Sequence, residues 1–268
     1  MTTRSTDART PGKFPGSGAL RQTGQMFGLG LDVVRGMFQR PFQLREFIQQ
    51  SWFIASVTIL PTALVAIPFG AVISLQFGSL ARQLGAQSYT GAGSVLATIQ
   101  QAAPLVTALL VAGAGGSAIC ADIGARTIRE EIDAMEVLGV SAVQRLVVPR
   151  VLASMLVAVL LNGMVMVVGV AGGYFFNVVL QGGTPGAYMS SFAALAQTSD
   201  LWIGEVKALV YGFIAAVVAC YRGLNPPPGP KGVGDAVNQS VVITFLLLFL
   251  VNGVITLIYL QLVPSKLS

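Results

Sequence analysis

Histidine is absent from this chain of 268 residues, and charged residues make up only 10% of it. Without histidine, and with single cysteines at Cys120 and Cys220, the sequence excludes a His-dependent catalytic triad and a clustered metal site. It also has no G-x-x-x-x-G-K-[ST] segment, so the chain is not by itself a P-loop ATPase. An ordinary soluble domain carries about 25% charged residues. The low charge content therefore argues against a soluble globular protein.

Long apolar segments take the place of the missing charge. Hydrophobic residues make up 54% of the chain, and its mean hydropathy is +0.73. A helix of about 20 apolar residues crosses about 30 Å of hydrocarbon, so segments of this length predict an all-α membrane protein. Five such spans are predicted, over Ser51 to Phe77, Ala102 to Ala121, Val151 to Leu180, Trp202 to Tyr221, and Gln239 to Val263.

The basic residues are distributed unevenly between the two sides of these spans. Of 16 lysines and arginines, 13 fall in the N-terminal region, the second loop or the fourth loop. Basic residues near the ends of spans stay on the cytoplasmic side of a membrane. The pattern predicts a multi-pass protein with a cytoplasmic N-terminus and, because the number of spans is odd, an external C-terminus.

The region before the first span divides into two parts. Residues 1–18 are rich in Thr, Ser, Gly and Pro, which is typical of a disordered tail. Residues 19–50 predict an amphipathic interfacial helix that places arginines among anionic headgroups and an apolar stripe in the acyl boundary. The stripe consists of Leu20, Phe27, Leu31, Val34 and Phe38, and it ends at Pro41. The alternative is that this helix packs on a partner protein or on the chain itself.

An acidic amphipathic helix is predicted in the second loop, over residues 125–139. Thr127 and Glu130 fit a capping box at its start, and Gly139 fits a left-handed stop at its end. Arg126 is expected to pair with Glu130, and Arg129 with Asp133, which leaves Glu131 and Glu136 for a partner. Ile128, Ile132, Met135 and Leu138 fall on one face. The alternative is a solvated surface helix.

Other features favour helix packing over chemistry. Gly113 to Ala118 matches a dinucleotide-binding fingerprint, but it lies inside a predicted span, where small residues let helices approach closely. Glu205 and Lys207 are the only charges within the spans, and their position beside Trp202 favours the membrane interface. Asn162 and Asn252 are expected to form hydrogen bonds between helices. No carboxylate pair or Ser/Lys constellation supports a lipid-modifying enzyme.

Two segments resemble a known family of membrane proteins. The run GGSAICADIGARTIREEIDAMEVLGVSAVQRLVVPRVLA is similar to the signature of MlaE/YrbE permeases, the membrane subunits of ABC-type lipid transporters that work with MCE-domain proteins. GPKGVGDAVNQSVV resembles the family's second cytoplasmic patch. The likeness covers about Phe47 to the C-terminus. Ala114, Asp122 and the Glu130-Glu131 pair depart from the commoner pattern and resemble the A-type YrbE subunit of actinobacterial Mce importers, which pairs with a B-type subunit.

The resemblance implies a five-span permease domain over residues 51–268 in a bacterial inner membrane, without enzymatic activity or a cofactor of its own. Its implied partners are a B-type permease, a cytoplasmic ABC ATPase that holds ATP and Mg²⁺, and a ring of MCE proteins; no nucleic acid is expected. The acidic helix would sit in a groove of the ATPase, with Ile128, Ile132 and Met135 as apolar anchors. The implied coupling residues are Thr127, Ile128, Glu130, Glu131, Ile132, Asp133, Met135 and Glu136.

The implied cargo is a fatty acid or a related lipid, moved inward. A single bundle of Gly- and Ala-rich spans is too small for a long acyl chain, so the path is expected at the seam between two permeases, lined by the first, second and fifth spans. Pro61, Pro68 and Gly70 predict a bent first span. The lipid-path candidates are Phe69, Val72, Leu75, Leu248 and Asn252. A scaffold subunit without a transport path, and sterol import, remain alternatives.

Overall fold

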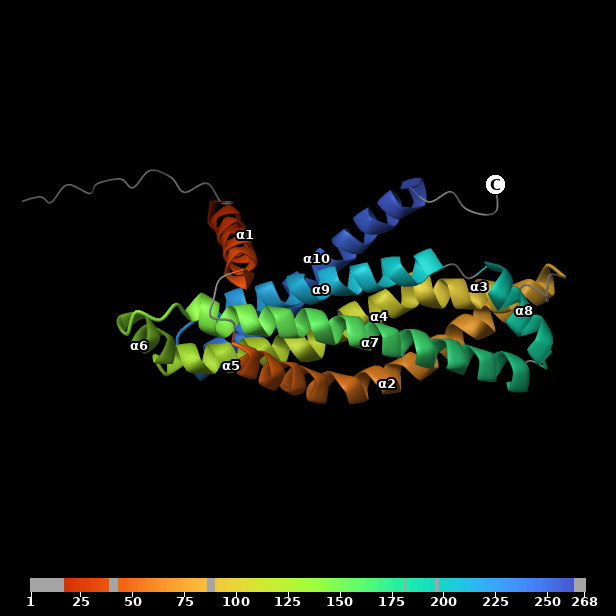
Figure 1. The fold of residues 1–268 in the computed structure, drawn as a ribbon, viewed down its shortest axis with the longest axis horizontal. Coiled ribbons are helices and arrows are strands. Elements are labelled where there is room, and N and C mark those ends of the chain that lie inside the picture. The colour runs from red at the N-terminus through yellow and green to blue at the C-terminus, as the bar shows by residue number, and fades with distance from the viewer. Residues whose placement is uncertain (1–16, 39–42, 86–89, 181, 196–197, 263–268) are drawn as a thin grey trace, which may run out of the picture.

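Long helices form an elongated bundle with short helices at both ends (Figure 1). The computed structural model describes residues 17–38, 43–85, 90–180, 182–195 and 198–262, and within these ranges it contains no strand. Five helical segments there are long and apolar enough to cross a membrane, which confirms the predicted number of spans. The predicted tail lies outside the described residues except for its last two positions, which already belong to the first helix.

All five spans begin earlier than predicted, and the first, second and fourth also end later. The first span is α2 (Leu44–Gln83), the fourth is α9 (Thr198–Leu224), and the fifth is α10 (Pro230–Leu262). The second span consists of α3 (Thr90–Ala97), η2 (Thr98–Ala102), α4 (Ala103–Leu110), η3 (Val111–Gly116) and α5 (Ser117–Ile128). The third consists of η4 (Val143–Val147), α7 (Val148–Phe175) and η5 (Phe176–Leu180), where η marks a π-helical turn. Outside the spans lie α1 (Ser17–Met37), α6 (Glu131–Val137) and α8 (Pro185–Leu195).

Helix α2 buries its small and polar residues and exposes its large apolar ones. The buried residues recur at intervals of four: Gln50, Ile54, Thr58, Thr62, Ala66, Gly70, Ser74 and Gly78. The hydroxyls of Thr58 and Thr62 donate to carbonyls one turn earlier, so burial leaves neither unsatisfied. Small residues let the helix approach its neighbours closely in a bilayer, where large apolar side chains gain nothing by facing inward. As predicted, α2 bends: it runs through Pro61 and Pro68 and is bowed along its length (Figure 1).

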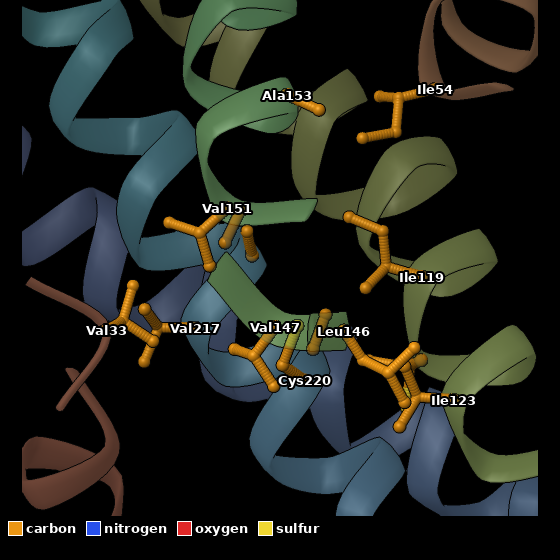
Figure 2. Close-up of a cluster of buried hydrophobic side chains, with 14 of the residues drawn as sticks. Val33, Ile54, Ile119, Ile123, Leu146, Val147, Val151, Ala153, Val217 and Cys220 are labelled. Atoms are coloured by element: carbon orange, nitrogen blue, oxygen red, sulfur yellow. The ribbon is translucent and has the colours of Figure 1, made fainter. Parts of the chain in front are cut away.

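Helix α7 packs closely against α2 and α9 through glycine. A Cβ atom on Gly70 of α2 would lie 2.3 Å from the carbonyl oxygen of Gly169 in α7. Nearer the start of α7, a Cβ on Gly212 of α9 would lie 2.7 Å from the carbonyl oxygen of Ser154 in α7. Both approaches are closer than any larger residue allows. Figure 2 shows the aliphatic core at one end of this contact, where Val147 of η4 and Val151 of α7 lie near Val217 and Cys220 of α9.

Two of the π-helical turns in the second and third spans, η2 and η4, end two residues before a proline. Pro104 follows η2, and Pro149 follows η4. Proline has no N–H to donate to the carbonyl one turn earlier, which for Pro104 is that of Gln100. Lys207 of α9 donates to this freed carbonyl instead, with a distance of 3.3 Å between Nζ and O. The backbone hydrogen bond that Pro104 cannot form thus leaves the Gln100 carbonyl as an acceptor inside the bundle.

Residues 19–50 were predicted to form an amphipathic interfacial helix. In the structure they belong to two helices, because α1 ends at Met37 and α2 begins at Leu44. Helix α1 lies crosswise to the long axis of the bundle (Figure 1). Val33 is buried in the core at Val217 (Figure 2), whereas Phe27, Leu31 and Phe38 of the predicted stripe are exposed. One face of α1 therefore packs on the chain itself, and its apolar stripe is left for another environment.

The five spans differ in how much of them the bundle covers. Only 11% of the most apolar window of α10 and 28% of that of α2 are buried, against 67% for the second span. The second span, which was expected to line the seam together with α2 and α10, is thus the most covered of these three spans. Small residues such as Gly115 and Gly116 place that span at the centre, as expected for a segment whose fingerprint-like run serves helix packing.

Candidate functional site

The acidic segment consists of two helices, not one. Thr127 lies in the last turn of α5, where its hydroxyl donates to the carbonyls of Ile123 (3.0 Å) and Gly223 in α9 (2.9 Å). Glu130 adopts a left-handed conformation (φ 60°) and precedes α6 without a side-chain cap. The predicted capping box is therefore wrong, because the Thr127 hydroxyl ties α5 to α9 instead of starting a new helix. The stop at Gly139 is confirmed: its φ is +73°, and Val140 N–H donates to Met135 O.

The ion pairs of this segment also differ from those predicted. Arg126 and Arg129 both contact Glu131, at 3.9 and 3.0 Å, and not Glu130 or Asp133. The turn at Glu130 changes the helical register, so residues four apart in sequence no longer lie on one face. Glu130, Asp133 and Glu136 are exposed and form no ion pair within the described part of the chain. Glu131 is thus held within the chain, and three carboxylates remain for a partner.

The apolar residues of the acidic segment do not share one face: some pack into the core and others are exposed. Ile132 is buried and Met135 is partly buried against the same core, so both are less exposed than an anchor in a partner's groove would be. Leu138 was expected beside them, but it is 78% exposed, and Val137 is 88% exposed. Ile128 is half-buried at the end of α5. Val137 and Leu138, together called the α6 tip below, present the exposed apolar surface at this end of the bundle.

Beneath α6 lies a buried arginine that the sequence analysis missed. The side chain of Arg150 in α7 is fully buried, and its Nη2 lies 2.5 Å from Oδ2 of Asp122 in α5. Its Nη1 donates to the carbonyl of Leu146 (2.8 Å) and lies 4.0 Å from Oε1 of Glu46 in α2. A buried charge persists only when it is paired and hydrogen-bonded. In the sequence, the one feature that could have indicated this buried arginine is its place next to Pro149, at the edge of an apolar span.

The Arg150 pair continues as a chain of ionic contacts to α6. Asp122 also contacts Nε of Arg126 at 3.3 Å, and Arg126 in turn contacts Glu131. The chain of contacts, called the ion chain below, consists of Glu46, Arg150, Asp122, Arg126 and Glu131. Because these residues come from α2, α7, α5 and α6, a displacement of α6 acts on the ends of three spans. The hydrogen bond from Thr127 to the Gly223 carbonyl connects α9 to the same end of α5.

A second polar cluster lies towards the other end of the bundle. Lys207 is only 2% exposed and lies inside the bundle, while its predicted position at the membrane interface stays a prediction. Besides the Gln100 carbonyl, its Nζ donates to Oγ1 of Thr256 in α10 (2.9 Å). Gln100 also donates to Asp200 of α9 (2.9 Å), which accepts from the phenol of Tyr259 as well. These bonds join the second, fourth and fifth spans, and charged groups within spans usually mark functional sites.

The two asparagines form bonds between spans, as predicted. Asn162 of α7 accepts from Thr107 of α4 (3.5 Å), and Asn252 of α10 accepts from the phenol of Tyr211 in α9 (2.7 Å). Leu248 lies one turn before Asn252 and packs on Tyr211, Ala108 and Ala112, with 2% of its surface exposed. Leu248 therefore faces the inside of this chain, and its place among the lipid-path candidates on an outer surface is wrong.

The candidates in α2 do lie on the outside. Phe69, Val72 and Leu75 are all exposed, on the same side of the helix as the other large apolar residues. Helix α10 likewise exposes Leu246, Phe249 and Leu250. In a bilayer such faces contact either lipid or another subunit.

An apolar cavity of about 470 Å³ opens at the end of the bundle opposite α6, beneath α8. Met166 and Tyr174 of α7 and Tyr188 and Phe192 of α8 contribute to its lining. Burial raises the pKa of the Tyr188 phenol, so this group stays protonated against Ser94 at neutral pH. Helix α8 was not predicted, although Pro185 suits the first position of a helix.

Known proteins resemble this chain over the region that holds its five spans. The family model of permease MlaE matches residues 47–258. A probable ABC transporter permease protein of Synechocystis sp. is 31% identical over 230 residues, 86% of this chain and 85% of that protein. One of Rickettsia bellii is 30% identical over 226 residues, 84% and 87% of the two chains. Protein TRIGALACTOSYLDIACYLGLYCEROL 1, chloroplastic, of Arabidopsis thaliana is 29% identical over 192 residues, 72% of this chain and 55% of that protein. The chain therefore belongs to the MlaE permease family, whose similar members are named as ABC transporter permeases.

Proposed function

We propose that this chain is the permease subunit of an ATP-driven lipid importer, in which a cytoplasmic ABC ATPase binds the α6 tip and moves the spans. The ion chain is the observation that carries the proposal. It joins α6 to the ends of α2, α5 and α7, and so gives a movement of α6 a direct path to the helices of the bundle. ATP and Mg²⁺ belong to the ATPase in this arrangement, and the permease contributes no catalytic group.

Coupling residues follow from exposure as well as from the family resemblance. Val137 and Leu138 replace Ile132 and Met135 as apolar anchors, because they project from α6 and the latter two do not. Asp133 and Glu136 are the acidic groups that face outward beside them, and Glu130 lies at the turn. Thr127, Ile128 and Glu131 act from within the chain, since they hold α5 and α6 in place. A short helix with an apolar tip and an acidic rim suits a groove with basic edges.

The orientation proposed for the chain places α6 in the cytoplasm and the C-terminus outside. Within the described residues, Arg126, Arg129, Arg145 and Arg222 all lie in or beside helix ends that meet near α6. Arg82, at the end of α2, lies at the opposite end of the bundle. This distribution supports the orientation, because basic residues accumulate on the cytoplasmic side.

Reporter fusions test the orientation. A reporter that is active only outside the cytoplasm is expected to work when fused after Gly183 or Ser268 and to fail when fused after Gly139, because an odd number of spans separates each external site from α6. The matched control is a cytoplasm-specific reporter at the same three positions, which should give the reverse result. Cytoplasmic activity at Ser268 with external activity at Gly183 would show that one of the five helices does not cross the membrane.

The lipid path is proposed at the seam with a second, B-type permease. Phe69, Val72 and Leu75 of α2 line it on this side, with Asn252 at the edge of α10. These two helices support the seam because they carry the largest uncovered apolar faces in the bundle. An MCE ring on the external side delivers the lipid. A fatty acid is the proposed cargo, with a sterol as the alternative, and a relative named for trigalactosyldiacylglycerol supports a lipid in either case.

Photo-crosslinking tests both the path and the cargo. A fatty acid with a photoreactive group on its acyl chain is expected to label α2 near Phe69 and Val72 in the assembled pair, and to label it less without the B-type partner. Leu160 of α7 is the apolar control, because it is exposed and lies outside both the α2 face and the lining of the cavity beneath α8. Excess unlabelled fatty acid should suppress the α2 label, whereas suppression by a sterol alone would favour the alternative cargo. Equal labelling of α2 and α7, unchanged by the partner, would contradict the seam.

A further inference from the structure

An apolar groove lies between α1 and the spans α9 and α10, away from the proposed seam residues of α2. Its volume is about 350 Å³, within the usual range for sites that hold small apolar molecules. Gly30 and Leu31 of α1, Phe213 and Val217 of α9, and Leu247 and Val251 of α10 contribute to its walls. Helix α1 projects from the side of the bundle, crosswise to its long axis (Figure 1), and the groove lies where α1 meets α9 and α10.

Polar contacts fix one end of this groove. The phenol of Tyr221 donates to Oε1 of Gln25 in α1 (2.9 Å), and Nη2 of Arg222 donates to Oε1 of Gln22 (3.5 Å). Gln22 and Gln25 flank Thr23, which lines the groove. The guanidinium of Arg222 also lies over the Tyr221 ring, 5.9 Å from its centroid. The polar groups therefore meet the apolar walls at the Thr23 end.

Within the described part of the chain, no carboxylate neutralises the charge of Arg222. Its Nε is buried without a hydrogen-bond partner, and no carboxylate among the described residues lies within ion-pair distance of it. Arg21 is exposed next to Gln22, so a second positive charge lies near this end. The only carboxylate of α1, Asp32, is about three helical turns away from Gln22. A guanidinium that lacks a carboxylate partner at the end of an apolar groove suits an amphiphile with an anionic oxygen group.

We propose that this groove binds one anionic phospholipid from the leaflet in which α1 lies. One acyl chain occupies the space between α1 and the two spans, and the phosphate accepts hydrogen bonds from Arg222. The bound lipid fills the gap that α1 leaves against α9 and α10, and so fixes the position of α1. This site differs from the cargo path in its helices and does not depend on whether the chain transports lipid.

Native mass spectrometry of the full-length chain, extracted with phosphatidylglycerol or with phosphatidylcholine, tests the site. The wild type is expected to retain one phosphatidylglycerol. Gly30→Leu should abolish retention by filling the groove, whereas Gly30→Ala should not, because its Cβ would lie 3.9 Å from Phe213 and Val217. Gly28→Leu is the matched control, since nothing lies within 4 Å of a Cβ there. Retention by Gly30→Leu at the wild-type level would overturn the proposal.

The headgroup is tested by Arg222→Gln, which removes the charge and keeps a hydrogen-bonding side chain. Its preference for phosphatidylglycerol over phosphatidylcholine is expected to fall by about tenfold, the usual loss for a bond to a charged group. An unchanged preference would overturn the role of Arg222. Glycerol phosphate, which has the anionic group without acyl chains, should not displace the lipid; displacement would show a phosphate site only. A photoreactive acyl chain on phosphatidylglycerol should crosslink to α1 and α10 peptides, and the absence of these crosslinks would contradict the groove as the site.

Discussion

Replacing Asp122 with alanine is expected to lower the free energy of unfolding by about 3 kcal/mol, because it leaves the buried Arg150 guanidinium without its nearest counter-charge. This is the lower end of the range for a broken buried pair, since Asp122 is partly exposed and Glu46 remains 4.0 Å from Arg150. The measurement is the thermal stability of the purified chain in detergent, together with the fraction that stays monodisperse. Asp133→Ala is the matched control, because this carboxylate is exposed and outside the ion chain.

A double variant separates stability from coupling. In Asp122→Ala combined with Arg150→Met, neither charge remains buried alone, so most of the lost stability should return. The ion chain is nevertheless broken between α7 and α5, and transport is expected to stay impaired while the ATPase still binds. Should the double variant be as unstable as Asp122→Ala, the loss would come from packing and not from an unpaired charge.

Local patterns predicted the parts of the fold that depend on local physics. The five spans were predicted because hydrophobic length is a property of each segment alone. The stop at Gly139 was predicted because glycine adopts a positive φ without strain. The bend of α2 was predicted because a proline inside a helix bends it, whatever the helix packs against.

Contacts between distant segments account for what was missed. The break at Glu130 depends on the bond from Thr127 to Gly223, which is 96 residues away in sequence. The burial of Leu248 was hidden because α10 is apolar on every side, so its sequence carries no sign of which face meets Tyr211. Lys207 has its acceptor in a carbonyl that Pro104 frees in another span. The hydrophobic periodicity of the sequence does not indicate any of these contacts, because each one depends on how the helices pack together.

The second large effect is expected at the α6 tip. Val137→Asp together with Leu138→Asp should abolish co-purification of the ATPase, because apolar anchors at the centre of an interface contribute about 2–4 kcal/mol each. The fold should be unaffected, since both side chains are exposed and outside the core. Leu84→Asp is the matched control: its side chain is also apolar and 73% exposed, but it follows α2 at the opposite end of the bundle. Intact co-purification of the tip variant would mean that the ATPase binds elsewhere.

The most direct measurement of coupling between α6 and a lipid path is ATP-dependent transfer of a labelled fatty acid in proteoliposomes. The vesicles contain this chain, the B-type permease and the ATPase, and the α6 tip variant is compared with the wild type and Leu84→Asp. Transfer is expected to require ATP in the wild type and the control, and to be absent in the tip variant. A wild-type complex that hydrolyses ATP without moving lipid, or a tip variant that transfers lipid at the wild-type rate, would contradict a permease driven through α6.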